Sequence, residues 1–317
     1  LIGALHLQGA DLDSLFTGEG HAPAALTPAE RSFPAAPTDR AARLCLPEWL
    51  IAAFDNSLQD KADQTAIDLQ GRAPVVLRVN TMKSTRASAQ EALSEAGVDT
   101  QPNPLSDTAL TVLNGARKIR SAAPYLDGRV ELQDAASQAV AALVPIDGRV
   151  LDYCAGGGGK ALALAANGAE NVFAQDIAQQ RMTALPTRAS RDGAQNEILT
   201  TGSFRRLLGW NTRICDAPCS GSGAWRRSPE GKWTLTPNRL TELTTIQDDI
   251  LANAANLTAD QGTLVYATCS VLREENEDRV AAFLNSHQGW SQVFERRINV
   301  SDHGDGFFTA HLKRDKA

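Results

Sequence analysis

The sequence contains no long apolar run. Its longest purely apolar segment covers residues 139–144, whereas a helix that spans a membrane needs about 20 apolar residues. No basic segment followed by an apolar one opens the chain, so we expect no secretory signal. With 317 residues, 43% of them hydrophobic and 21% charged, the composition is that of an ordinary soluble globular protein of about two domains.

Cysteine is scarce, and the number of cysteines is odd. Five cysteines do not fit a disulfide framework and favour a reducing compartment, so we expect a cytoplasmic protein. Cys215 and Cys219 could instead share a zinc ion, but the five histidines form no ligand pair at the usual spacing. No metal site is therefore predicted.

The charge of the chain is unevenly distributed. The net charge of −6 does not by itself indicate a nucleic-acid-binding protein. Residues 71–130 hold eight Lys or Arg and five Asp or Glu, a net of +3, so the rest of the chain carries −9. A locally basic face can bind phosphates, and a solvated surface of mixed charge fits the same counts.

Two familiar nucleotide-binding motifs are missing from the glycine-rich segment at residues 154–160. A phosphate-binding P-loop would need Gly at position 154 and Ser or Thr at position 161, where this chain has Cys154 and Ala161. The dinucleotide pattern Gly-x-Gly-x-x-Gly is absent in any register. Glycines between a predicted strand and a predicted helix still allow close approach of the backbone to a ligand, so a ligand-binding loop is predicted.

Hydrophobic periodicity divides the chain into three predicted parts. Residues 1–70 are mainly helical, residues 71–130 form a small α+β subdomain, and residues 131–317 form an α/β domain. In the small subdomain, strands are predicted at residues 74–80 and 109–113, with a helix between them.

The α/β domain is predicted to be doubly wound, with a mostly parallel sheet, because its strands alternate with helices. The predicted strands are residues 149–153, 171–176, 197–201, 213–216 and 263–269, with a last strand from residue 306. The predicted helices are residues 135–144, 160–167, 237–257 and 274–284.

Two of these strands deliver a cysteine to the same edge of the sheet. Asp216 and Cys219 follow one strand in a turn of small residues, and Cys269 ends the next strand. Open α/β sheets build their sites outside the carboxyl ends of the strands. The sequence therefore predicts a site that contains an aspartate and two thiols.

Four segments resemble the RNA cytosine-C5 methyltransferases of the Sun (Fmu) family. They are Asp-Ala-Pro-Cys-Ser-Gly at 216–221, Arg-Arg-Ser-Pro-Glu-Gly-Lys-Trp at 226–233, Tyr-Ala-Thr-Cys-Ser at 266–270 and Glu-Asn-Glu at 275–277. The resemblance implies a Rossmann-like class I methyltransferase domain that uses S-adenosylmethionine. An RNA-recognition-like subdomain and a helical RNA-binding region are expected before it. The expected substrate is a cytosine of RNA, above all ribosomal RNA, in a loop or flipped out of its stack.

The resemblance also assigns roles at the predicted site. Carbon 5 of cytosine is a poor nucleophile, and addition of a thiolate to carbon 6 yields an enamine that can attack a sulfonium methyl group. By resemblance, Cys269 is the attacking thiol and Cys219 assists its release. Asp216 would hydrogen-bond the edge of the base, and Lys160 would orient the site.

The predicted cofactor site combines the glycine-rich loop with a carboxylate that follows the second strand. Asp176 can accept hydrogen bonds from both ribose hydroxyls or can cap the next helix, and the loop before it favours the ribose. By resemblance the ligand is S-adenosylmethionine. The expected contact residues are Cys154, Ala155, Gly156, Gly157, Gly158, Gly159, Lys160, Asp176, Ser203 and Asp216.

The chain departs from the family pattern at two places. The family has Ala-Pro-Gly-Gly-Lys-Thr where residues 156–161 are Gly-Gly-Gly-Gly-Lys-Ala, and loss of the proline makes the loop more flexible. The family also has an Asp after the third strand, where Ser203 stands. These differences leave open a catalytically silent RNA-binding protein of the same fold. A DNA cytosine methyltransferase is a third alternative, although those enzymes use a Pro-Cys rather than a Thr-Cys nucleophile.

Two groups of basic residues are candidates for contacts with RNA phosphates. Surface solvation is the alternative interpretation for both groups. The candidates are Arg78, Lys83 and Arg86 in the small subdomain and Arg226, Arg227 and Lys232 after Asp216.

Overall fold

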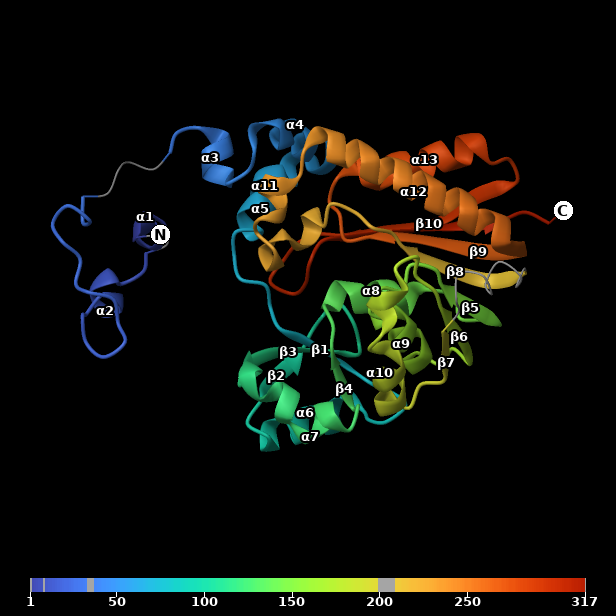
Figure 1. Cartoon of the computed structure of the whole chain (residues 1–317), viewed down its shortest axis with the longest axis horizontal. Helices are drawn as coiled ribbons and strands as arrows, with labels where there is room; N and C mark the ends of the chain where they lie inside the picture. Colours follow the sequence, from blue (N-terminus) through green and yellow to red (C-terminus); the bar gives the residue numbers. More distant parts are fainter. Residues whose placement is uncertain (1, 8, 33–36, 199–208, 317) are drawn as a thin grey trace. The chain divides into compact units, whose positions relative to one another are not determined.

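The chain folds into two compact units, Leu1–Glu48 and Trp49–Ala317. The computed structural model (Figure 1) describes residues 2–7, 9–32, 37–198 and 209–316. Among these residues, no helix combines the length and the hydrophobicity that crossing a bilayer requires. The boundaries that the sequence suggests at residues 70 and 130 stay predictions.

Short helices make up the first unit. They are α1 (Ile2–Leu7), α2 (Leu12–Leu15) and α3 (Arg40–Leu44). The side chains of Asp11 and Asp39 accept hydrogen bonds from backbone N–H groups in the first turns of α2 and α3. Because an N-cap carboxylate satisfies donors that the helix itself leaves free, these aspartates fix where each helix begins.

The second unit starts with helices and continues into a small antiparallel sheet. Its strands follow the order β2-β3-β1-β4, and α6 packs on the sheet through Ala89 and Leu93, which are fully buried. The bounds are α4 Glu48–Leu58, α5 Ala62–Asp68, β1 Val76–Val79, α6 Arg86–Glu95, β2 Asp99–Pro102, β3 Ala109–Asn114, α7 Ala123–Leu126 and β4 Val130–Leu132. The two predicted strands and the helix between them are confirmed, whereas β2 and β4 were not predicted.

A seven-stranded sheet forms the centre of the second unit. Its order is β10-β11-β9-β8-β5-β6-β7; β5 to β9 pair in parallel, and β10 and β11 pair antiparallel. The strands are β5 Arg149–Asp152, β6 Asn171–Ala174, β7 Asn196–Ile198, β8 Trp210–Asp216, β9 Thr258–Thr268, β10 Trp290–Ile298 and β11 Phe307–Arg314. This arrangement confirms the predicted doubly wound, mostly parallel fold, to which the unpredicted strand β10 adds an antiparallel edge.

Helices cover both faces of this sheet (Figure 1). They are α8 Ala135–Leu143, α9 Gly159–Ala166 and α10 Leu185–Asp192, then α12 Pro237–Leu257 and α13 Glu277–Ser286. Neighbouring residues of β8 point to opposite faces: Ile214 packs in a core with α9 and α10, and Cys215 packs in a core with α12 and α13. Cys215 is thus a buried core residue.

The order of the strands reverses beside β5. The chain runs from β5 outward through β6 to β7 and then returns to place β8 on the other side of β5. The loops after β5 and β8 therefore leave the sheet in opposite directions and open a crevice at its carboxyl edge, where α/β proteins bind their ligands.

Candidate active site

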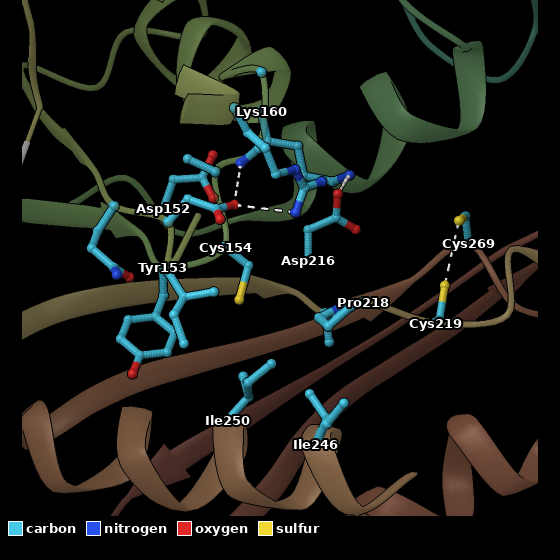
Figure 2. A pocket seen from close by; sticks show the side chains of 18 of the residues that line it. Asp152, Tyr153, Cys154, Lys160, Asp216, Pro218, Cys219, Ile246, Ile250 and Cys269 are labelled. Atoms are coloured by element: carbon cyan, nitrogen blue, oxygen red, sulfur yellow. Dashed lines mark hydrogen bonds and ion pairs between the residues drawn. The ribbon is translucent and has the colours of Figure 1, made fainter. Parts of the chain in front are cut away.

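A cavity of about 910 Å3 lies at the carboxyl ends of β5, β6, β8 and β9 (Figure 2). The glycine-rich loop lines it, together with Asp176, Asp216, Cys219 and Cys269. On the other side, Ile246 and Ile250 of α12 point toward Pro218 (Figure 2). The structure thus brings the predicted cofactor loop and both predicted thiols to one cavity.

The glycine-rich loop needs glycine for its backbone path. Gly156 and Gly158 have φ angles of +53° and +80°, values that other residues adopt only with strain. A Cβ atom on Gly158 would lie 2.3 Å from Cδ1 of Leu185. Residues 154–157, Gly159 and Lys160 line the cavity, so a ligand there can approach the backbone closely.

Asp176 fastens the glycine-rich loop to the segment after β6. It is 2% exposed, and its carboxylate accepts hydrogen bonds from the N–H groups of Gly156 and Ala178, each at 2.8 Å. Nη1 of Arg181 lies 3.5 Å from Oδ2 of Asp176. Asp176 also lines the cavity, so a ligand can reach it. Ser203, the other predicted contact after β6, lies outside the described residues.

Lys160 and Asp216 form an ion pair at the floor of the cavity. Nζ of Lys160 lies 2.5 Å from Oδ2 of Asp216 and 3.3 Å from Oγ of Ser137. Lys160 is 5% exposed and lies over the ring of Phe307, 5.0 Å from its centroid. Because the ammonium group is buried and held at three points, it orients the Asp216 carboxylate.

The two thiols contact each other. Sγ of Cys219 lies 3.4 Å from Sγ of Cys269, and a dashed line joins these two side chains in Figure 2. The hydrogen bond with Cys269 and burial raise the pKa of the Cys219 thiol well above its usual value. Cys219 therefore retains its proton, and the two sulfur atoms lie close enough to share a hydrogen bond.

A glycine contact supports the backbone beneath the thiols. The N–H of Gly223 donates to the carbonyl of Cys269 at 2.9 Å, and the N–H of Gly306 donates to the carbonyl of Gly223 at 2.9 Å. A Cβ atom on Gly223 would lie 2.2 Å from the carbonyl oxygen of Gly306. Backbone hydrogen bonds thus join the loop after β8 to the loop after β9 and to the segment before β11.

Glu275, which follows Cys269 in the chain, binds the loop that carries Cys219, a role that sequence reasoning missed. It is fully buried and accepts hydrogen bonds from the backbone N–H of Ser220 at 2.8 Å and from the hydroxyl of Ser220 at 2.5 Å. Nε2 of Gln247 donates to Glu275 at 3.1 Å and to the carbonyl of Pro218 at 2.9 Å. The signal was present in the Glu-Asn-Glu segment, but only as part of the family resemblance.

Asp152 is a second residue of the cavity without a predicted role. It ends β5 and is 1% exposed. Burial raises its pKa to about 7, the negative charge of Asp216 adds to that effect, and the positive charge of Lys160 opposes it. Three charged groups therefore share one small region, and the protonation of Asp152 is sensitive to the other two.

Comparisons with known proteins assign the family. Residues 140–313 match the profile described as 16S rRNA methyltransferase RsmB/F, and residues 46–119 match the ferredoxin-like domain of RsmF/B-like methyltransferases. The chain belongs to this family. The predicted resemblance is confirmed, and with it the class I methyltransferase fold, the enzyme class and S-adenosylmethionine as cofactor.

Similar curated proteins carry one name. The chain is 33% identical over 288 residues to ribosomal RNA small subunit methyltransferase B of Salmonella typhi, covering 86% of this chain and 67% of that one. It is 31% identical over 284 residues to the protein of that name from Yersinia pseudotuberculosis, covering 84% and 66%. The chain thus spans about two thirds of the length of these relatives.

Solved structures of similar fold cover most of the chain. The crystal structure of PH0851 has a TM-score of 0.81 and 26% identity, and covers 90% of this chain and 71% of that one. NSun6 from Pyrococcus horikoshii with SFG has a TM-score of 0.73 and 18% identity, and covers 86% and 99%. These likenesses confirm the methyltransferase fold in the described residues.

Most of the basic residues predicted to contact phosphates are engaged inside this RsmB/F-family chain. Arg78 is 1% exposed and its Nη2 lies 3.5 Å from a carboxylate oxygen of Asp192. Nε of Arg226 lies 2.8 Å from Asp305, so both predictions of phosphate contact are wrong. The charges balance carboxylates whose sequence positions are distant, which no local pattern reveals.

The other candidates differ in exposure. Lys232 is 5% exposed, so its predicted phosphate contact is wrong. Arg227 pairs with Asp134 and Asp305, but its side chain is 38% exposed, so its contact with phosphate stays a prediction. Nζ of Lys83 donates to two backbone carbonyls.

Among the described residues, no group of three or more His, Cys, Asp or Glu side chains could hold a metal ion.

Proposed function

We propose that this chain transfers the methyl group of S-adenosylmethionine to carbon 5 of a cytosine in RNA, with ribosomal RNA as the substrate class. The observation that supports this most directly is the 3.4 Å contact between the thiols of Cys219 and Cys269. Both thiols line the cavity that the glycine-rich loop and the Lys160–Asp216 ion pair also line. Curated relatives named as ribosomal RNA methyltransferases support the choice of RNA.

The cofactor fits the part of the cavity between the glycine-rich loop and Asp176. Glycine backbone allows close contact there, and Asp176 offers a carboxylate to ribose hydroxyls. NSun6 from Pyrococcus horikoshii, which shares the fold, was solved with SFG, an S-adenosylmethionine analogue. When bound, S-adenosylmethionine supplies an electrophilic methyl group on a sulfonium centre.

The reaction begins with the attack of the Cys269 thiolate on carbon 6 of the cytosine. Asp216, held by Lys160 at 2.5 Å, accepts a hydrogen bond from the exocyclic amine of the base and so positions the ring. The electron pair of the 5,6 double bond would move to carbon 5, which would take the methyl carbon of the cofactor while the bond from that carbon to the sulfonium sulfur breaks and leaves S-adenosylhomocysteine. The target base must leave its stack to reach these groups.

The second half of the reaction restores the aromatic ring. A base removes the proton from carbon 5, the electron pair re-forms the 5,6 double bond, and the bond between carbon 6 and Cys269 breaks. Cys219, whose raised pKa keeps it protonated, donates a hydrogen bond to the departing sulfur at 3.4 Å. Cys269 thereby returns to the thiolate paired with the Cys219 thiol.

Bisulfite sequencing tests the proposal, because 5-methylcytosine resists the deamination that converts unmodified cytosine. We would incubate the purified chain with S-adenosylmethionine and ribosomal RNA from cells that lack its gene. One or a few protected cytosines should appear, and heat-inactivated protein should give none. Methyl transfer without a protected cytosine would place the methyl group on another atom. Binding of RNA with neither transfer nor donor binding would favour the catalytically silent alternative.

A further inference from the structure

The glycine-rich loop is held from behind by an arginine of α10. Nη1 of Arg188 donates a hydrogen bond to the carbonyl oxygen of Gly157. Nε of the same side chain lies 3.2 Å from Oε2 of Glu131 in β4. One guanidinium group thus connects the cofactor loop to the small antiparallel sheet.

A second carbonyl of the loop is held from the same sheet. The carbonyl oxygen of Gly159 accepts hydrogen bonds from Nη1 of Arg78 at 3.1 Å and from Nε2 of Gln133 at 3.3 Å. Arg78 also donates to Oε1 of Gln133 at 2.6 Å. The loop is therefore fixed through alternate carbonyls, at residues 157 and 159.

These contacts matter because the loop consists of four consecutive glycines. Glycine has more conformational freedom to lose on ordering than any other residue, and this loop lacks the proline that the family pattern has at position 157. Hydrogen bonds from rigidly placed donors reduce that freedom in the folded state. Gly156 and Gly157 also line the cavity, so the order of the loop determines how well a ligand binds.

We propose that Arg188 is a positioning residue for the cofactor, and that its hydrogen bond to Gly157 supplies rigidity that a proline supplies elsewhere in the family. The inference rests on the proposed binding of S-adenosylmethionine at this loop. Arg188 itself does not line the cavity. It acts on the cofactor only through the backbone of the loop.

Arg191 provides a matched control on the same helix. It also donates to Oε2 of Glu131, and its side chain is 20% exposed, close to the 25% of Arg188. No contact joins Arg191 to the loop among the hydrogen bonds and ion pairs of the described residues. Removal of either arginine leaves Glu131 paired with the other, so both single variants keep a partner for this buried carboxylate.

The experiment measures the affinity of the whole chain for S-adenosylhomocysteine by isothermal titration calorimetry. Arg188→Ala should raise the dissociation constant about tenfold, as expected for loss of one hydrogen bond from a charged donor. Arg191→Ala should change it less than twofold, although it should cost at least as much thermal stability, because Arg191 also pairs with Asp192 and lies over the ring of Tyr125. Equal loss of affinity in both variants, or an unchanged affinity in Arg188→Ala, would overturn the proposal.

A second substitution separates loop rigidity from simple loss of a contact. Gly157 does not have a positive φ angle, and a Cβ atom there would meet only Nη1 of Arg188 at 3.6 Å, so alanine fits. When added to Arg188→Ala, the substitution Gly157→Ala should lower the dissociation constant for S-adenosylhomocysteine at least about twofold, because alanine restricts the backbone. No recovery would mean that Arg188 does not act through the loop. Failure of the unchanged chain to bind S-adenosylhomocysteine would instead count against the cofactor site itself.

Discussion

The sulfur atoms of Cys219 and Cys269 lie 3.4 Å apart, although 50 positions separate them in the chain. Parallel pairing of β8 with β9 produces this contact, because it places Asp216 beside Ala267. Cys219 lies three residues beyond Asp216, and Cys269 lies two residues beyond Ala267. The separation of the thiols is therefore set by strand register rather than by the flexible parts of the loops.

The two thiols should behave differently when each is removed. Cys269→Ala should abolish methylation and form no covalent complex, because it lacks the nucleophile. Cys219→Ala should still attack and transfer the methyl group but stall before release, so a protein–RNA adduct should accumulate as a shifted band on a denaturing gel. The double variant should show no band. A band from Cys269→Ala and none from Cys219→Ala would reverse the two roles.

Removal of the Asp176 carboxylate should weaken cofactor binding. A hydrogen bond to a charged group is worth about 1.5–3 kcal/mol, so Asp176→Ala should raise the dissociation constant for S-adenosylmethionine at least about tenfold. Circular dichroism should show an intact fold. Asp176→Asn keeps an acceptor for the N–H of Ala178. Its affinity for S-adenosylmethionine should therefore lie between those of the unchanged chain and of Asp176→Ala. An affinity that does not change would restrict Asp176 to fastening the loop.

Exposed cations of the small subdomain are the better candidates for phosphate contacts now that Arg78 is known to be buried. Arg117, Lys118 and Arg120 are exposed on one short 3-10 helix, Ala116–Ser121. Replacing all three with Ala should weaken RNA binding and reduce the slope of log K against log salt by about 0.7 to 0.9 per lost contact. The control Arg296→Ala removes an exposed cation of β10 and should leave the slope unchanged.

Stability should depend on pH through Asp152. Its pKa in the folded chain is about 7, raised from 3.8, so the folded state holds this proton more tightly than the unfolded state. The stabilisation is complete below about pH 4 and is lost as the pH rises to 7. Each pH unit in this window is worth about 1.4 kcal/mol. Urea unfolding of the unchanged chain and of Asp152→Asn should therefore diverge between pH 4 and pH 7, with the asparagine variant gaining relative stability.

Above pH 7 the difference in unfolding free energy between the unchanged chain and Asp152→Asn should stay constant. This constant difference checks that the pH dependence arises from Asp152. If the two chains keep the same difference in unfolding free energy from pH 4 to pH 8, then Asp152 titrates normally and its charge is compensated in the fold. Asp302, which is exposed and does not line the cavity, offers a control aspartate. Asp302→Asn tests whether removal of any carboxylate reproduces the effect of Asp152→Asn.

The alternation of strands and helices was enough to predict the large sheet. Val150, Leu151, Ile214 and Val265 are buried in strands that the sequence marks as apolar, and Thr236 caps α12 as its position before Pro237 indicates. The strands that were not predicted are short or lie at an edge. β2 is largely exposed. In β10, buried and exposed residues do not alternate regularly, because it is an edge strand that pairs only with β11.

The candidate site was predictable where the chemistry lies in motifs and unpredictable where it depends on distant partners. The glycine-rich loop, Asp216 and both thiols meet at one cavity, although their roles stay proposals. Arg226 has the sequence context of a surface cation, but its carboxylate partner, Asp305, lies 79 positions away in the chain. A charge that is paired through tertiary structure has no local signature, so sequence reasoning overestimated the basic surface.

Gly223 has a consequence for how this chain can vary. It adds no atom to the cavity wall, yet a Cβ atom there would meet the backbone of Gly306 at 2.2 Å. Any other residue would force the segment before β11 away from the loop whose carbonyl at Cys269 receives the N–H of Gly223. The distance between the two sulfur atoms therefore depends on a position that has no side chain, and substitutions there should be as damaging as loss of a thiol.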